Sequence, residues 1–268
     1  MRRLPYLYIL AVFILSFGMS FIPGLDATRF DPLLAGQPQA PSLHHPFGTD
    51  DLGRDVLVRS ISGAKISLLV GIVSVVLSTV LGVSVGLLCG YFEGVTDAII
   101  MRLVDVLMAL PTLFLILIIQ SLWKPSIWNV VIVIGLTSWM GTTRLVRAEV
   151  LSVKQRLFII SAKARGISTS RLVFKHMLPH TLSPVIVSAT LGVGSAILTE
   201  SVLSFLGLGV QPPYASWGNM LERSVPLMNE APWMSIVPGV LITLTVLSLN
   251  VLSDHARAAL NKKERVVS

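Results

Sequence analysis

The residues able to carry metal, nucleophilic or phosphate chemistry are few in this chain and lie far apart. It has five histidines and one cysteine, Cys89, which lies in a hydrophobic run and is expected to be a small packing residue. His44 and His45 precede Asp50 and Asp51 at a spacing without regular ligand geometry, and no third donor converges on them. The histidines are scattered over separate loops, which argues against Ser-His-Asp or Cys-His catalysis. The sequence also has no G-x-x-x-x-G-K-[ST] phosphate cradle, so we expect no metal, no enzymatic activity and no bound ATP in this chain.

A cationic segment, Ser161 to His180, is the most distinctive feature of the chain. It holds four Lys or Arg, two His and no acid, with Gly166 near its start and a Leu-Pro near its end. Glycine is a natural helix C-cap, and Ser168 or Thr169 can cap a second helix that stops before the proline. We therefore expect a helix over 151–165, a sharp turn and a short second helix.

The short second helix would carry an apolar patch that is too small to form a core. Leu172, Val173 and Met177 make up the patch, and Arg171 and Lys175 lie at its rim. Such a patch suits a groove on a soluble partner protein. An ordinary loop, basic only because it faces the cytoplasm, is the alternative, but that loop needs no second helix. We interpret the segment as a docking loop.

The elements that must position this loop are predicted to cross a membrane. Of the 268 residues 53% are hydrophobic and only 13% are charged, and the mean hydropathy is +0.77. A soluble domain of this size needs more polar surface. A bilayer core of about 30 Å needs about 20 apolar residues of helix. Without sustained β-alternation we expect a helical bundle. The predicted spans are 4–22, 66–90, 104–122, 127–145, 182–206 and 233–252.

The distribution of Lys and Arg predicts how the spans are oriented. With the N-terminus inside, the six outer cations are Arg29, Arg54, Arg59, Lys65, Lys124 and Arg223, which leaves 15 of the 21 Lys and Arg on the inside. Cytoplasmic loops carry such an excess, so both ends and the docking loop are predicted to be cytoplasmic. This explains the net charge of +7 without a nucleic-acid partner. The run at 4–22 is too long for a signal-peptide core and lacks a cleavage site, so we interpret it as a retained anchor.

The second predicted span carries a ridge of small residues, one at every fourth position. Small residues at this spacing let two helices approach closely in lipid, and a pore-lining role is the alternative interpretation. The ridge consists of Ser74, Ser78, Gly82, Gly86 and Gly90, and the pattern continues to Gly94.

Polar residues in or near the spans are candidates for a transport path. Charged side chains in lipid are costly and usually face the interior of a bundle. Asp105 lies one turn from Arg102, so a local ion pair between them is as good an explanation as a substrate contact. Glu200 and Asn250 are expected to be hydrogen-bond partners between helices. The candidates are Asp105, Gln120, Asn129, Thr199, Glu200 and Asn250.

The docking loop resembles the E-A-A-x-x-x-G-x9-I-x-L-P signature of the membrane subunits of bacterial ABC importers. Ala162, Gly166, Leu178 and Pro179 fall at matching positions. The replacements at Ile160, Ser161 and His176 are typical of the peptide/nickel permease branch, although His180 stands where that branch usually has Asn. The segments 48–68, 200–221 and 250–260 also resemble this branch, so that the resemblance covers about 47 to 260. The length is most similar to the second, C-type, permease subunit.

The resemblance implies a six-span bundle of the type I importer permease class in the bacterial inner membrane. It also implies two unlike permeases in lipid on two cytoplasmic ATPases, which bind ATP and Mg²⁺, and an external binding protein that delivers peptides and docks on loops such as 207–232. A nickel or metal-chelate importer of the same branch is the alternative, and a secondary transporter is the alternative class, but we find no internal repeat. The residues implied to dock on an ATPase are Ser161, Ala162, Lys163, Ala164, Arg165, Gly166, Arg171, Leu172, Lys175, His176, Leu178 and Pro179.

These expectations divide the chain into four parts. The N-terminal anchor spans 1–22 and an extracytoplasmic segment spans 23–65. The permease core, 66–255, contains five spans and the cytoplasmic coupling loop at about 147–180. A cytoplasmic tail, 256–268, follows.

Overall fold

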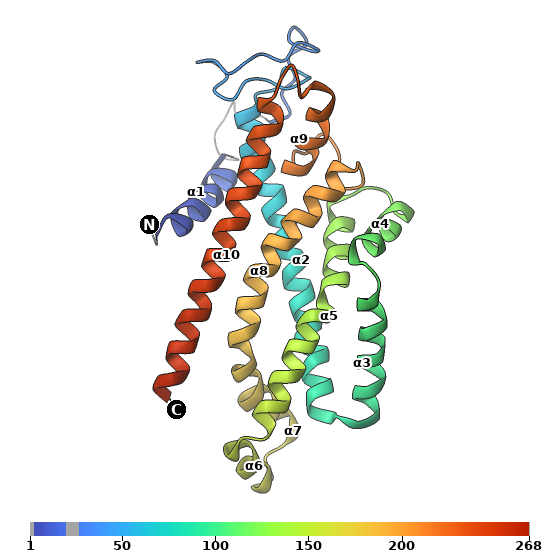
Figure 1. Ribbon diagram of the computed structural model, residues 1–268, viewed down its shortest axis with the longest axis vertical. Coiled ribbons are helices and arrows are strands. Elements are labelled where there is room, and N and C mark those ends of the chain that lie inside the picture. Colours follow the sequence, from blue (N-terminus) through green and yellow to red (C-terminus); the bar gives the residue numbers. More distant parts are fainter. Residues whose placement is uncertain (1–2, 20–26, 268) are drawn as a thin grey trace.

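The computed structural model describes residues 3–19 and 27–267, with side chains described as far as residue 260. Every regular element in this part of the chain is a helix, as predicted (Figure 1). Four helical stretches are long and apolar enough to cross a membrane, and a bent pair makes up to five. The four are α2 (Val56–Phe92), α5 (Ile127–Lys154), the stretch Thr169–Phe205 that ends in α8 (Leu178–Phe205), and α10 (Trp233–Val267).

The first predicted span is represented by a shorter helix, α1 (Leu4–Gly18), which packs against α10 and α2. Its 15 residues correspond to about 22 Å, less than the roughly 30 Å of a bilayer core. The hydroxyl of Tyr8 donates a hydrogen bond to the carbonyl of Leu241 at 3.2 Å and so joins α1 to α10. Residues 20–22 of the predicted span lie outside the described residues.

The helix of the second predicted span starts ten residues before 66, the predicted first residue of that span. α2 begins at Val56 and runs unbroken for 37 residues, about 55 Å at 1.5 Å per residue. The carboxylate of Asp55 caps it by accepting hydrogen bonds from the amides of Leu57 and Val58, at 2.8 and 3.1 Å. Because the cap lies ahead of the apolar run, the helix starts outside the membrane and continues into it.

The predicted third span, 104–122, is wrong as a single helix. α3 (Gly94–Ala109) and α4 (Thr112–Leu122) meet at 86°. Leu110 between them is extended, with φ −84° and ψ 134°, because the ring of Pro111 disfavours a helical conformation in the preceding residue. Hydropathy alone did not register the proline as a break.

The two ends of the bundle carry different elements (Figure 1). The segment from residue 27 to 55 gathers at one end with α9 (Trp217–Ser224), whereas the short helices α6 (Leu157–Ala164) and α7 (Thr169–Arg171) lie at the other, toward the C-terminus of α10. α10 remains helical to Val267, so the predicted tail after 255 is part of this helix.

Candidate functional site

The docking loop, Ser161 to His180, follows the end of α5 at Lys154 and begins within α6, which starts at Leu157. α6 stops at a glycine turn in which Gly166 has a φ of +75°. The amide of Gly166 donates to the carbonyl of Lys163 at 3.0 Å, and the amide of Ile167 donates to that of Ala162 at 3.3 Å. These two bonds form a Schellman motif, which needs a left-handed residue after the helix. The sharp turn predicted at this glycine is therefore present.

The second half of the loop differs from the prediction, because no separate short helix stops before Pro179. α7 continues into a π-helical turn, Leu172–Met177, and then directly into α8. Pro179 is the second residue of α8, so it lies directly after the π-helical turn and inside the continuous helical stretch Thr169–Phe205. Ser168 lies at the N-cap position, but its side chain makes no capping hydrogen bond. The second half of the docking loop, from Thr169 onward, is thus an extension of the long helix α8.

Two of the three residues of the apolar patch proposed for docking are buried, and the third, Val173, is partly buried. Leu172 and Met177 are 1% and 0% exposed and pack against Val150, Ile159 and Ala162. Residues of α5, α6 and the π-helical turn thus share one small core, which also includes Val185 of α8.

A different set of residues forms the free surface of the loop. Leu157, Ile160 and Phe174 are exposed to 82%, 52% and 62%. Since Ile159 and Ala162 turn one face of α6 inward, the apolar residues on its other face point outward. The helical period of the Leu-Phe-Ile-Ile run could have identified this face from the sequence.

The predicted docking residues fall into three groups by their exposure. Ala162 and Leu172 are buried, and His176 and Leu178 are partly buried. The exposed members are Ser161, Lys163, Ala164, Arg165, Gly166, Arg171, Lys175 and Pro179.

The small-residue ridge of α2 packs against α5 of the same chain. A Cβ added at Gly82 would lie 2.6 Å from that of Thr142, one at Gly86 would lie 2.7 Å from that of Val146, and one at Gly90 would contact α5 in the same way. Toward the outer end of the ridge, the hydroxyl of Ser74 donates to a carbonyl of α5 at 3.2 Å. The other ridge residue, Ser78, is buried as well. Only residues without a Cβ allow this helix separation.

A groove runs along the seam between α5 and α8. Its outer part, of about 240 Å³, lies between α2, α5 and α8, and its inner part, of about 470 Å³, lies between α5, α8 and α10. Ser188 lines both parts, so they adjoin each other along α8. The lining residues recur every three or four positions and therefore occupy one face of each helix. They include Ser138, Gly141, Leu145 and Glu149 on α5, and His180, Pro184, Ser188, Gly192, Ser195 and Thr199 on α8.

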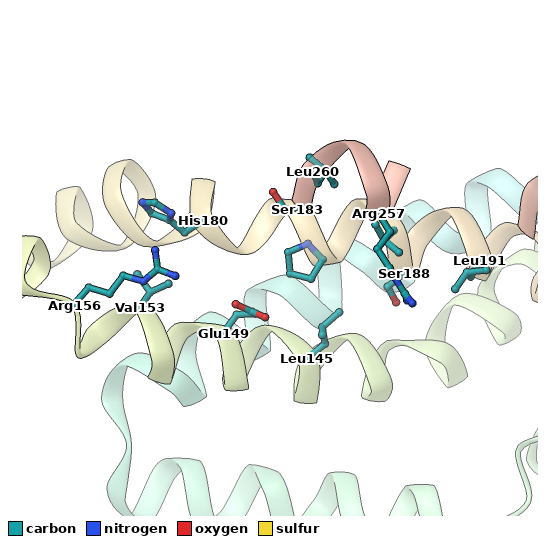
Figure 2. A pocket seen from close by; sticks show the side chains of 12 residues that line it. Leu145, Glu149, Val153, Arg156, His180, Ser183, Ser188, Leu191, Arg257 and Leu260 are labelled. Carbon is teal, nitrogen blue, oxygen red and sulfur yellow. The ribbon is translucent and has the colours of Figure 1, made fainter. Parts of the chain in front are cut away.

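The composition of the groove differs from that of a lipid-facing surface. Hydroxyl side chains and glycines dominate its outer part, and its inner part holds charged residues, shown in Figure 2. By contrast, Ile186 of α8 and Val76 and Val80 of α2 are apolar and about half exposed. A groove of small and polar side chains suits water or solute rather than acyl chains.

Ion pairs join α3 to α5, and one of them is not the predicted pair. Asp105 pairs with Arg144 of α5 instead of Arg102, which lies one turn away on its own helix. Asp97 holds Arg147 with two hydrogen bonds of 2.5 and 2.6 Å. The side chains of Arg144 and Asp105 are 46% and 58% exposed, although the arginine lies about 15 Å from the inner end of α5. Such a pair would be costly against acyl chains, so this side of α5 must be covered by protein or water.

Glu200 is a buried hydrogen-bond partner between helices, as predicted. Its carboxylate accepts hydrogen bonds from Ser67 of α2 at 3.0 Å and from Ser204 at 2.6 Å. The amide of Trp217 in turn donates to the hydroxyl of Ser67 at 3.3 Å, and that of Val210 donates to Ser204 at 3.0 Å. This cluster ties α2 and α8 to the outer loop.

The remaining polar candidates differ in their surroundings. Gln120 is buried and donates to the carbonyl of Leu208 at 2.8 Å. Asn129 and Thr199 bond to carbonyls close by in the sequence. Asn250 is exposed and makes no side-chain hydrogen bond to another helix within the described part of the chain, so its predicted role has no support.

Contacts between polar side chains hold the outer segment together. His45 contacts Asp55 at 2.9 Å, and Asp50 holds Arg54 at 2.7 Å and Arg59 at 3.3 Å. Within the described ranges no group of three or more His, Cys, Asp or Glu is placed to hold a metal ion. The segment is therefore a compact ionic cap over the start of α2.

Comparison with known proteins identifies the family. The profile of the binding-protein-dependent transport system inner membrane component matches residues 82–266, which include α5, the docking loop and α8. The chain belongs to this family. It is a permease subunit of an ABC importer and a multi-pass protein of the bacterial cytoplasmic membrane.

Individual relatives agree with this assignment. The chain is 42% identical over 225 residues to the dipeptide transport system permease protein DppC of Alkalihalophilus pseudofirmus, covering 84% of this chain and 74% of that protein. It is 40% identical over 225 residues, with the same coverage, to the oligopeptide transport system permease protein OppC of Bacillus subtilis. The family resemblance noted in the sequence is thus confirmed.

Two solved structures show that the fold is that of other importer permeases. A chain of the MetNI methionine ABC transporter in inward-facing conformations superposes with a TM-score of 0.62 at 17% identity, over 76% of this chain and 96% of that one. A chain of an amino acid ABC transporter superposes with a TM-score of 0.55 at 13% identity, over 76% and 94%. The predicted helical architecture is therefore confirmed, and in the described part of the chain up to five stretches are long enough to span a membrane, where six were predicted.

Sequence reasoning missed several residues of this permease. Glu149, Arg156 and Arg257 line the inner groove, yet none was a candidate. The spacing of Ser138, Gly141 and Leu145 with Glu149 marks one face of α5 and could have pointed to the first of them. The arginines gave no such signal, because positive charge at the cytoplasmic ends of spans is expected in any case.

Proposed function

We propose that this permease forms one half of the path through which an ATP-driven importer moves short peptides into the cytoplasm. The groove between α5 and α8 is the observation that carries the proposal. Small and polar side chains line it along a length of helix that can span a membrane. The names of the relatives, a dipeptide and an oligopeptide transport permease, support peptides as the cargo.

A second, unlike permease would close the groove from its open side. The half-exposed pair of Asp105 and Arg144 supports this arrangement, since it needs protein or water rather than lipid beside it. The peptide path would then lie between the two permeases. An external binding protein would deliver the peptide to the end formed by the ionic cap and α9.

Energy would come from two cytoplasmic ATPases, which hold ATP and Mg²⁺. The exposed face of α6 with the neighbouring cations is the surface that would dock on one of them. The core shared by Ile159, Leu172 and Met177 supports this role, because it couples that surface mechanically to α5 and α8, the two walls of the groove.

Cysteine accessibility tests whether the groove is the path. In a Cys89→Ala background, Ser188→Cys places a thiol in the groove and Ile186→Cys places one on the lipid-exposed side of the same helix. A thiol reacts as its thiolate, which forms in water rather than in lipid. We expect a charged, membrane-impermeant thiol reagent to modify the groove cysteine in the complete transporter at least about tenfold faster.

The matched cysteine also defines the result that contradicts the proposal. If the thiol at 186 reacts as fast as the one at 188, or faster, the groove is not a water-filled path. A change in the reactivity at 188 alone upon addition of Mg-ATP would link the groove to the ATPase cycle.

A further inference from the structure

The inner part of the groove gathers ionisable side chains from several elements. Glu149 comes from α5, Arg156 from the turn between α5 and α6, His180 from α8 and Arg257 from α10, around a cleft of about 470 Å³. Cavities of this size hold small ligands in other proteins. Figure 2 shows Arg156 and His180 at one end of the cleft, the carboxylate of Glu149 further along it, and Arg257 reaching in from the opposite wall.

Glu149 is the feature that an ordinary cytoplasmic surface does not explain. The positive-inside rule accounts for the arginines, but it requires no acid beside them. Glu149 is partly buried, and among the described side chains no cation lies within ion-pair distance of it. A carboxylate in this position lacks a positive partner, and the cleft beside it has room for one.

We propose that this cleft binds the two charged ends of a peptide as it leaves the groove, an inference that rests on the proposed function. Glu149 would pair with the terminal ammonium group, and Arg156 or Arg257 with the terminal carboxylate. A single acid set between cations at either end of the cleft matches a zwitterion better than it matches a cation or an anion alone.

The exposure of these groups fits a site that binds the peptide weakly and releases it, rather than one that retains it. Arg156, His180 and Arg257 are all exposed. Ion pairs in contact with water are weak, and a transport site must release its cargo to be useful. The site would therefore bind the peptide briefly and with low affinity, adding preference for free termini to the selectivity of the external binding protein.

Photo-crosslinking in the complete transporter tests the proposal without depending on uptake. p-Benzoylphenylalanine in place of Leu145, an uncharged lining residue, would capture tritiated trialanine in nanodiscs of phosphatidylcholine. We expect unlabelled trialanine to suppress the labelling, and N-acetyl-trialanine amide to need a concentration higher by roughly tenfold, since it lacks both charges.

Charge variants then assign the two ends of the peptide. Glu149→Gln should raise the concentration of trialanine needed for half-displacement roughly three- to fivefold and leave that of N-acetyl-trialanine unchanged. Arg257→Gln together with Arg156→Gln should have the corresponding effect for trialanine but not for its C-terminal amide. Glu222→Gln, an exposed glutamate at the outer end, is the matched control and should change neither value.

Three results would overturn the proposal, each while leaving the proposed function standing. The first is equal competition by free and blocked peptides, and the second is an equal weakening of both by Glu149→Gln. The third is displacement of the labelling by phosphatidylglycerol added to the nanodisc, which would assign the cleft to a lipid headgroup. If ATP-dependent peptide uptake by the wild-type complex is also absent, the proposed function fails as well.

Discussion

The contact between α2 and α5 gives a prediction whose magnitude follows from the structure. Gly86→Ala adds one Cβ, which would lie 2.7 Å from the Cβ of Val146 and 2.8 Å from the carbonyl oxygen of Thr143. Favourable carbon contacts are about 3.5–4.0 Å apart, so α2 and α5 must separate locally by about 1 Å. The carbonyl oxygen of Thr143 belongs to the backbone, so a change of side-chain rotamer cannot relieve this contact.

The expected cost of this separation is that of an overpacked core, about 1–3 kcal/mol. The free energy of unfolding of the purified permease should fall by this amount, and Gly86→Leu should prevent assembly. Because the ridge also positions α5, which forms one wall of the groove, transport should fall together with the amount of assembled complex.

The assay is the abundance in the membrane and the unfolding midpoint of the complex in detergent. Gly239→Ala in α10 is the matched control, because a Cβ there meets nothing within 4 Å. It should be neutral or slightly stabilising, since alanine favours a helix by about 1 kcal/mol relative to glycine. The reasoning is refuted if Gly86→Ala leaves the midpoint as high as that of Gly239→Ala.

Four further predictions concern other parts of the chain. Gly166→Val should abolish coupled ATPase activity in a normally inserted protein, whereas Gly166→Asn, which tolerates a positive φ better, should retain part of it; equal activities would contradict the turn argument. Arg147→Gln should lower stability by about 1–3 kcal/mol by leaving Asp97 unpaired, and Asp97→Asn should recover part of the abundance; a wild-type abundance of the single variant would contradict the ion-pair argument. Ser216→Ala removes the cap of α9 and should cost about 1 kcal/mol in thermal unfolding, and an unchanged midpoint would mean that the cap is dispensable. A reporter inserted near Gln39 should be external and one at the C-terminus cytoplasmic, and a cytoplasmic reporter at the first position would contradict the topology.

Local chemistry explains which features could be predicted from the sequence. The turn at Gly166 was predictable because a left-handed C-cap depends on a few neighbouring residues. The ridge on α2 was visible as a spacing, but its partner was not, because the choice between α5 and another chain depends on tertiary packing. Hydropathy is averaged over a window of residues, so the average does not reveal the bend at Pro111 or the early start of α2 after Asp55.

The docking loop shows the limit of sequence patterns more sharply. Pro179 was expected to end a helix, yet it sits in the first turn of α8 after a π-helical segment. An apolar triplet is compatible with either a docking patch or a local core, and the position of α6 decides between them. Once Ile159 and Ala162 cover Leu172, the exposed patch must lie on the other face of α6.

Uptake by proteoliposomes tests the central claim most directly. The permease would be reconstituted with its partner permease and ATPases, and accumulation of a radiolabelled dipeptide would be measured with and without the binding protein and Mg-ATP. We predict accumulation only when the binding protein and Mg-ATP are both present, and no accumulation when Gly166 is replaced by valine. Uptake driven by a proton gradient without ATP, or accumulation of a nickel chelate but no peptide, would contradict the account.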